Sequence, residues 1–198
     1  MRNKFGTAEA TKMEEVLAWR HYEYAGEKDV KDSGWGCVFR SVQNAVLEVM
    51  GECHVPTMRK MVDGVRHSIL SKLPHGWIEP SNLDEFLQKK VLIGEKTACE
   101  AWRTPAVNAN MFRKSGITEY TSKEPAEIIK SFVGSAESAP RALVLDDGVF
   151  GVCYIMRGDS IVQVDPHSTE EAQVTRMSND DFQKVLEKGA MMLFVHKL

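Results

Sequence analysis

The chain has 198 residues, of which 43% are hydrophobic and 27% charged, a composition that excludes a largely disordered chain and predicts one globular domain spanning residues 1–198. Its formal net charge is -3, so no excess of basic residues points to nucleic acid or an anionic membrane surface as the main partner. No apolar run reaches the roughly 18 residues that a membrane-spanning helix needs, which predicts no direct insertion into a membrane.

The four cysteines, at positions 37, 53, 99 and 153, lie far apart and form no CxxC pair. This spacing predicts reduced thiols in an intracellular protein, and the sequence lacks the closely spaced Cys or His pairs of a zinc site. The first ten residues are charged and polar and lack the apolar stretch of a secretory signal. We therefore expect a cytoplasmic protein, with recruitment to the endoplasmic reticulum surface as one option, and no metal or organic cofactor.

The first two thirds of the chain show mainly helical patterns. The strongest begins at Cys37 and runs to residue 50, with apolar residues at i, i+4, i+7, i+8 and i+11 and with Gly51 in place to end the helix. Ser81 with Asp84 forms a capping pattern for a short helix that runs to residue 90. Further helices are predicted over residues 8–19, 56–73 and 125–133, whereas residues 91–121 show no pattern that we can assign.

The pattern changes to short β-rich runs beyond residue 140. Two turn sequences, Asp-Asp-Gly and Arg-Gly-Asp, separate three of these runs, which predicts an antiparallel meander. The three predicted strands cover residues 141–145, 149–156 and 160–164. A helix capped by Ser178 and ending at Gly189 then leads to a last strand over residues 190–196. Helices followed by a sheet indicate an α+β domain of two packed layers.

Cys37 is the candidate nucleophile because it stands at the start of the strongest predicted helix. Unpaired N–H groups and the positive end of the helix dipole both favour the thiolate, which is the reactive form of cysteine. Glycines on both sides of Trp35 let the backbone turn tightly and let a substrate main chain approach, so Trp35 and Gly36 are candidate substrate-binding residues. The alternative is that Cys37 is a small buried hydrophobic residue and that the glycines only shape a turn.

Asp165 and His167 are the candidate orienting carboxylate and base. Residues two apart in an extended chain point to the same side, and Pro166 between them favours that conformation, so the two side chains can meet. The carboxylate would hold the imidazole in one tautomer while His167 takes the proton from Cys37. The alternative is an ordinary turn beside an exposed histidine.

Two motifs taken together resemble one protease family. The ten residues from Gly34 to Gln43 (GWGCVFRSVQ) are similar to the Gly-Trp-Gly-Cys-aromatic-Arg-x-x-Gln motif of the proteases specific for the ubiquitin-fold modifier (UFM). The sequence Asp-Pro-His at residues 165–167 matches that family's Asp-Pro-His, in the same chain order. A Tyr upstream of the Cys, in a His-Tyr-Gly context, also belongs to the pattern, and residues 21–26 (HYEYAG) supply it in altered form. Weaker likenesses lie at Trp77-Ile78 and over residues 140–154.

The resemblance implies a papain-like cysteine protease fold of the α+β class, in which a helical layer carries the Cys and an antiparallel sheet carries the Asp and His. It also implies a thiol-dependent hydrolase that cleaves after the C-terminal Gly of UFM, maturing the precursor and removing the modifier from its conjugates. The residues that carry over as catalytic are Cys37, Asp165, His167 and, as hydroxyl donor to the oxyanion, Tyr24. Tyr22 is the alternative donor, because Tyr24 is followed by Ala25 rather than Gly and the spacing from Tyr24 to the Cys is one residue longer than the family's.

Other functions are compatible with the same residues. Autophagy-related cysteine proteases also pair Gly-Trp-Gly-Cys with Asp-Pro-His, although those chains are usually longer and their Tyr lies farther upstream of the Cys. A catalytically inert module that binds the modifier usually loses at least one of the three polar catalytic positions, and all three are present here. A different acyl-transfer enzyme could use the same Cys, His and Asp. The expected partners are UFM and its conjugates.

Overall fold

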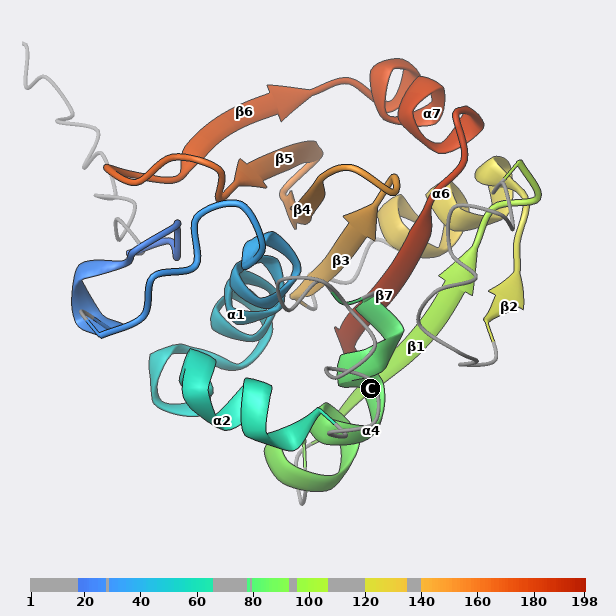
Figure 1. Cartoon of the computed structure of the whole chain (residues 1–198). Helices are drawn as coiled ribbons and strands as arrows, with labels where there is room; N and C mark the ends of the chain where they lie inside the picture. The colour runs from blue at the N-terminus through green and yellow to red at the C-terminus, as the bar shows by residue number, and fades with distance from the viewer. Residues whose placement is uncertain are drawn as a thin grey trace, which may run out of the picture.

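A mixed sheet forms the centre of the structure, a computed structural model that describes residues 18–27, 29–65, 78, 80–92, 96–106, 120–134 and 140–198. The strands within these residues are β1 (Thr97–Arg103), β2 (Thr121–Ser122), β3 (Arg141–Asp146), β4 (Gly151–Arg157), β5 (Ser160–Asp165), β6 (Gln173–Met177) and β7 (Met191–Lys197). They form one seven-stranded sheet in the order β2-β1-β7-β3-β4-β5-β6 (Figure 1). β1 and β2 pair in parallel, and the other neighbouring strands pair antiparallel.

Helices cover both faces of this sheet. One face is covered by α1 (Cys37–Met50), α2 (Met58–Gly64) and α4 (Asp84–Phe86), and the other by α6 (Pro125–Val133) and α7 (Asn179–Glu187). Short 3-10 turns lie at Ala25–Glu27, Glu52–His54 and Pro80–Leu83, and a π-helical turn lies at Leu87–Val91. The expected two-layer arrangement is therefore wrong, because the sheet lies between two helical layers.

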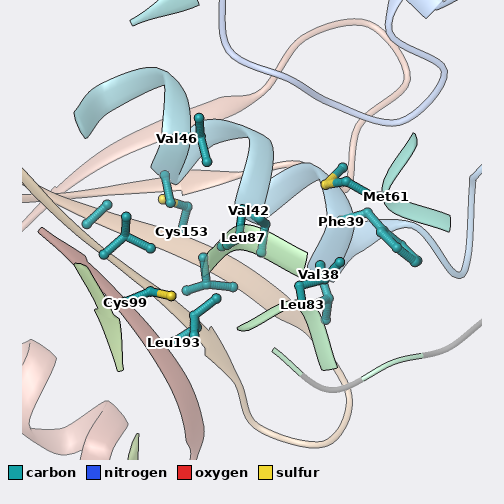
Figure 2. Close-up of a cluster of buried hydrophobic side chains, with 14 of the residues drawn as sticks. Val38, Phe39, Val42, Val46, Met61, Leu83, Leu87, Cys99, Cys153 and Leu193 are labelled. Carbon is teal, nitrogen blue, oxygen red and sulfur yellow. The ribbon is translucent and has the colours of Figure 1, made fainter. Parts of the chain in front are cut away.

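The central strands are apolar on both faces, which is why they need two helical layers. Successive side chains of a strand point to opposite faces, so each strand contributes to two separate hydrophobic clusters. Residues on the α1 face include Val144, Cys153 and Leu193, and those on the opposite face include Leu143, Tyr154 and Phe194. Figure 2 shows the first cluster, to which α1 contributes Val42 and Val46.

The start of α1 is seated closely on β4. The Ser41 hydroxyl donates a hydrogen bond to the Gly151 carbonyl oxygen over 3.1 Å. A Cβ on Gly151 would lie 2.7 Å from Val38 Cγ2 and 3.0 Å from the Val38 backbone nitrogen, so this approach requires glycine. The first turn of α1 is thereby fixed beside the strand that pairs with β5, and β5 ends at Asp165.

Several predicted elements agree closely with the structure. α1 and α6 have the predicted bounds, and the meander is confirmed as β3, β4 and β5, although β4 begins at Gly151 rather than at residue 149. The Ser178 hydroxyl caps α7 by accepting the Asp181 backbone N–H over 3.1 Å. The helix predicted over residues 56–73 begins at Met58 and ends at Gly64, whereas residues 66–73 lie outside the described residues.

Other predictions fail or fall outside the described residues. The prediction missed β1, β2 and β6. β6 is exposed along nearly its whole length, so it carries no alternation of buried and exposed residues that would predict a strand. The helix predicted over residues 8–19 and Trp77 lie outside the described residues, except for residues 18 and 19. Among the described residues, no helix has both the length and the apolar character to cross a membrane.

Candidate active site

Cys37 is the first residue of α1, and a tight turn delivers the chain to it. The Asp32 carbonyl oxygen accepts the backbone N–H groups of Trp35 over 3.1 Å and of Gly36 over 2.8 Å. Gly34 adopts a φ of 86°, a conformation that glycine reaches without strain. The Cys37 side chain is half-buried and forms no disulfide, so it stays accessible at the helix N-terminus.

Asp165 and His167 form a hydrogen-bonded pair at the end of β5. The Asp165 carboxylate accepts the His167 backbone N–H over 3.0 Å, and the same oxygen lies 2.5 Å from His167 Nδ1. The hydrogen bond from the His167 side chain lowers the pKa of the Asp165 carboxyl despite its burial. Nδ1 therefore carries the proton that faces the carboxylate, and Nε2 is the ring nitrogen that can exchange a proton with another group.

The Cys37 side chain contacts the His167 ring, although the two residues are far apart in the sequence. Cys37 begins α1, and His167 follows the end of β5. Burial alone would lower the pKa of His167, but the hydrogen bonds and negative charges of Asp165 and Cys37 raise this pKa to about 9. The imidazole is therefore protonated at neutral pH. A protonated imidazole beside a cysteine favours attack by the sulfur, because its positive charge stabilises the thiolate, the reactive form.

Tyr22 completes this cluster. Its hydroxyl contacts the Cys37 side chain and accepts the Gly34 backbone N–H. Its ring lies edge-on to His167 at 5.4 Å between centroids, and its backbone N–H donates to the Pro166 carbonyl oxygen over 2.9 Å. Burial, followed by the charge of Cys37, raises the pKa of Tyr22 well above its usual value. The hydroxyl therefore stays protonated and can donate a hydrogen bond.

Tyr24, the residue expected to supply the oxyanion hydroxyl, does not line the cavity beside Cys37 and contacts other residues. The Arg20 guanidinium stacks over its ring at 4.3 Å, and its ring lies edge-on to His21 at 5.6 Å. Tyr22, the alternative that the sequence left open, is the tyrosine beside Cys37. The signal that could have selected it is the residue before the tyrosine: His21 directly precedes Tyr22, as in the His-Tyr-Gly pattern, whereas Glu23 precedes Tyr24. Glu23 takes the place of the Gly in that pattern and has a φ of 53°, in the region that glycine favours.

Two hydrogen bonds from Asn44 on α1 help to explain why Tyr22, and not Tyr24, lies beside Cys37. The Asn44 side chain accepts the Arg20 backbone N–H over 2.6 Å and donates to the Arg20 carbonyl oxygen over 3.0 Å. Two residues later, Tyr22 is bound to Pro166. The chain is thus fixed on both sides of His21, and the left-handed turn at Glu23 carries Tyr24 away from the sulfur.

A cavity of about 280 Å³ opens beside Cys37. Its lining is mostly apolar and includes Trp35, Ile78, Val149, Phe150, Tyr22 and His167. Gly36, the other predicted substrate-binding residue, is buried, and a Cβ on it would lie 2.5 Å from Asp32 Oδ2. The glycine of this turn that lines the cavity is Gly34, which has open space where a Cβ would stand.

The sequence analysis missed Val149 and Phe150. Both side chains are about half exposed, at 54% and 52%, although they line the cavity, and the Phe150 ring lies edge-on to His167 at 5.0 Å. They follow an Asp-Asp-Gly turn, and the sequence pattern placed both in the strand predicted over residues 149–156, whereas β4 begins at Gly151. Two large apolar residues in a turn would have been the signal, because turns usually expose polar side chains.

No arrangement of three or more His, Cys, Asp or Glu side chains that could hold a metal ion lies within the described ranges. The side chains that meet beside the cavity are those of Cys37, His167 and Tyr22, with Asp165 bound to His167.

The comparisons with known proteins show the fold. No protein-family model matches the sequence, and no curated protein matches it. Among solved structures, the chain is similar to the ubiquitin-specific protease encoded by a tegument protein of murine cytomegalovirus, in complex with a ubiquitin-based suicide substrate. The TM-score is 0.50 at 11% sequence identity, and the match covers 91% of this chain and 85% of that chain. The protein thus has a mixed α/β fold of the kind found in that ubiquitin-specific protease.

Proposed function

We propose that this protein is a cysteine protease that cleaves after the C-terminal Gly of a ubiquitin-like modifier. One observation carries the proposal: the Cys37 side chain, at the start of α1, contacts both His167 and the Tyr22 hydroxyl. His167 is in turn bound to Asp165. A nucleophile, a base with its orienting carboxylate, and a hydroxyl donor are the groups that acyl transfer from a peptide bond requires.

The chemistry follows from this arrangement. The Cys37 sulfur attacks the carbonyl carbon of the scissile bond and forms a C–S bond, and the carbonyl oxygen takes up the negative charge. The Tyr22 hydroxyl donates to that oxygen, a contribution of about 3 kcal/mol if it matches other oxyanion donors. The C–N bond then breaks as His167 gives its proton to the leaving amine. His167 then takes a proton from a water molecule, whose oxygen attacks the thioester carbonyl carbon. The C–S bond breaks, the free carboxylate leaves, and the Cys37 sulfur and the protonated His167 return to their starting state.

The cavity supports a substrate with a small residue at the cleavage point. Gly34 leaves open space on its wall, while the larger side chains of Trp35, Val149 and Phe150 also line it. A glycine tail has no side chain to exclude, so its main chain can reach the sulfur. The same site would serve a precursor extension and an isopeptide bond, because both place an amide after the terminal Gly.

The two sequence motifs narrow the proposed substrate to UFM and its conjugates. Gly34 to Gln43 and Asp165 to His167 resemble the UFM-specific proteases in residue type and in order. The viral structural neighbour is a ubiquitin-specific protease, which supports the wider class of ubiquitin-like modifiers. We propose that the enzyme acts in the cytoplasm, where UFM precursors and conjugates would reach it.

Intact mass measurement of cleaved precursors tests the proposal. The purified chain is incubated with precursors of several ubiquitin-like modifiers, each with a C-terminal extension, alongside Cys37→Ala and a matched Cys53→Ala variant, since Cys53 is an exposed thiol. We expect cleavage after the terminal Gly of UFM by the wild type and Cys53→Ala, and none by Cys37→Ala.

Other outcomes assign the protein differently. Cleavage of an autophagy-type modifier alone would show that this modifier, rather than UFM, is the substrate, and the proposed chemistry would be unchanged. If no precursor is cut while the chain still binds a modifier, the protein is an inert binding module. Turnover of small thioesters alone would indicate a different acyl-transfer enzyme.

A further inference from the structure

Asp32 is a buried carboxylate that belongs to neither the nucleophile nor the base. Its side chain and that of Arg40 are both 0% exposed. Arg40 Nε donates to Asp32 Oδ2 over 2.7 Å and Arg40 Nη2 to Oδ1 over 3.3 Å. Arg40 also binds Glu27 and Gln43, and the Gln43 amide donates to the Pro56 carbonyl oxygen over 2.8 Å. Asp32 is therefore held rigidly by a satisfied buried network.

This carboxylate connects the backbone that follows Tyr22 with the turn that precedes Cys37. Asp32 Oδ1 accepts the backbone N–H of Glu23, the residue after Tyr22, over 2.8 Å. The main chain of Asp32 closes the turn that leads to Cys37, and its side chain fills the space that a Cβ on Gly36 would need. One residue thus fixes the backbone that follows the tyrosine and the backbone that precedes the cysteine.

Glu23, whose backbone N–H binds Asp32, has a strained backbone conformation. Glu23 is the only non-glycine residue with a positive φ among those the structure describes, with a φ of 53°. Such a conformation persists only where surrounding contacts hold it. Two contacts hold this one: the bond from the Glu23 N–H to Asp32, and the bond from the Ser33 hydroxyl to the Glu23 carboxylate over 3.0 Å. Without the Asp32 acceptor, the backbone after Tyr22 would relax toward an ordinary conformation.

We propose that Asp32 is a positioning residue that keeps the Tyr22 hydroxyl aligned with the Cys37 sulfur. It acts through the Glu23 backbone and the turn before Cys37, and it touches neither substrate nor sulfur. The inference rests on the proposed function, because the alignment matters for a Tyr22 that donates to an oxyanion. A donor displaced by a fraction of an ångström loses much of its effect on the transition state.

A double-mutant cycle separates positioning from a general effect on folding. The variants are Asp32→Asn, Tyr22→Phe and the double variant, with Asp29→Asn as a matched exposed acid on the same loop. On a modifier precursor, we expect Asp32→Asn to lower kcat about tenfold with KM within about twofold. In the Tyr22→Phe background the same change should lower kcat by less than about twofold, because the hydroxyl that Asp32 aligns is already gone. An equal loss in both backgrounds would overturn the proposal.

A second readout does not depend on the substrate. The rate of Cys37 alkylation by iodoacetamide at pH 7 reports the environment of the sulfur alone. We expect Tyr22→Phe and Asp32→Asn each to change this rate in the same direction, and the double variant to match Tyr22→Phe. If the wild type cuts no precursor, the proposed function fails, yet additive effects on alkylation would still overturn the role of Asp32.

If Asp32→Asn does not fold, amide hydrogen exchange in the wild type tests whether Asp32 holds the Glu23 backbone. In the wild type, the Glu23 amide should exchange at least about tenfold more slowly than the same amide in an unstructured peptide, because it is bound to a buried carboxylate. Exchange at the unstructured rate would show that Asp32 does not hold this backbone, and the proposal would be wrong.

Discussion

The Tyr22 ring packs edge-on against His167, with 5.4 Å between the ring centroids, and the Tyr22 hydroxyl contacts the Cys37 side chain. The segment around Tyr22 therefore belongs to the candidate active site together with the start of α1 and the residues that follow β5. Because the Tyr22 backbone is also bound to Pro166, a movement of the Asp165–His167 loop would carry Tyr22 with it.

We expect different effects on kcat when Tyr22 and Tyr24 each lose the hydroxyl group. Tyr22→Phe keeps the ring against His167 but removes the donor beside Cys37, so we expect kcat to fall about 100-fold. Tyr24→Phe keeps the stack with Arg20 and should leave kcat within about twofold. Steady-state kinetics on a modifier precursor measures both. The reverse order of effects would restore Tyr24 as the donor.

The pKa of His167 predicts a pH dependence of stability. Burial opposes protonation of His167, but Asp165 and Cys37 raise its pKa from 6.5 to about 9. Folding therefore favours the protonated ring, and this stabilisation is fully present below about pH 6.5 and is lost as the pH rises through about 9. We expect the urea midpoint of the wild type, measured relative to His167→Gln, to fall across this range. A difference that stays constant with pH would contradict the prediction.

Gly36 should tolerate no side chain. A Cβ there would lie 2.5 Å from Asp32 Oδ2 and 2.6 Å from Asp32 Cβ, and Asp32 cannot move because Arg40 holds it in a fully buried pair. We expect Gly36→Ala to lower the free energy of unfolding by about 1–3 kcal/mol, as overpacking of a rigid site does. Urea denaturation is the measurement, with Lys31→Ala, an exposed position on the same loop, as the control. Equal stability of the two variants would show that the turn yields easily.

Phe150 should contribute to substrate binding. It is 52% exposed at the rim of the cavity, so a bound substrate can bury it. We expect Phe150→Ala to lower kcat/KM about tenfold, mainly through KM, which corresponds to about 1.4 kcal/mol. Val174→Ala is the matched control, because Val174 on β6 is also 52% exposed but does not line the cavity. Similar losses for both variants would argue against a contact specific to Phe150.

Local geometry made several features predictable from the sequence. The bounds of α1 follow from its apolar spacing and from Gly51, and the pairing of Asp165 with His167 follows from a two-residue spacing in an extended chain. The meander follows from short β-rich runs that are separated by glycine-containing turns. Each of these depends on residues that are close in the sequence, so the pattern contains the information.

Other features depend on contacts that no local pattern encodes. Strand β6 is exposed along nearly all its length and exists because β5 offers it a partner, so its residues show no burial period. The central strands are apolar on both faces, so each face needs a helical layer. Which helices cover each face is decided by tertiary packing.

The sequence by itself determined where a helix would present a cysteine and that a carboxylate and an imidazole would meet, because both are matters of local spacing. Only the tertiary structure brought Cys37 and His167 together and selected Tyr22 over Tyr24. Both tyrosines lie in the same short polar segment. The choice between them was made by Asn44 on α1 and Pro166 after β5, two contacts that exist only once the chain has folded.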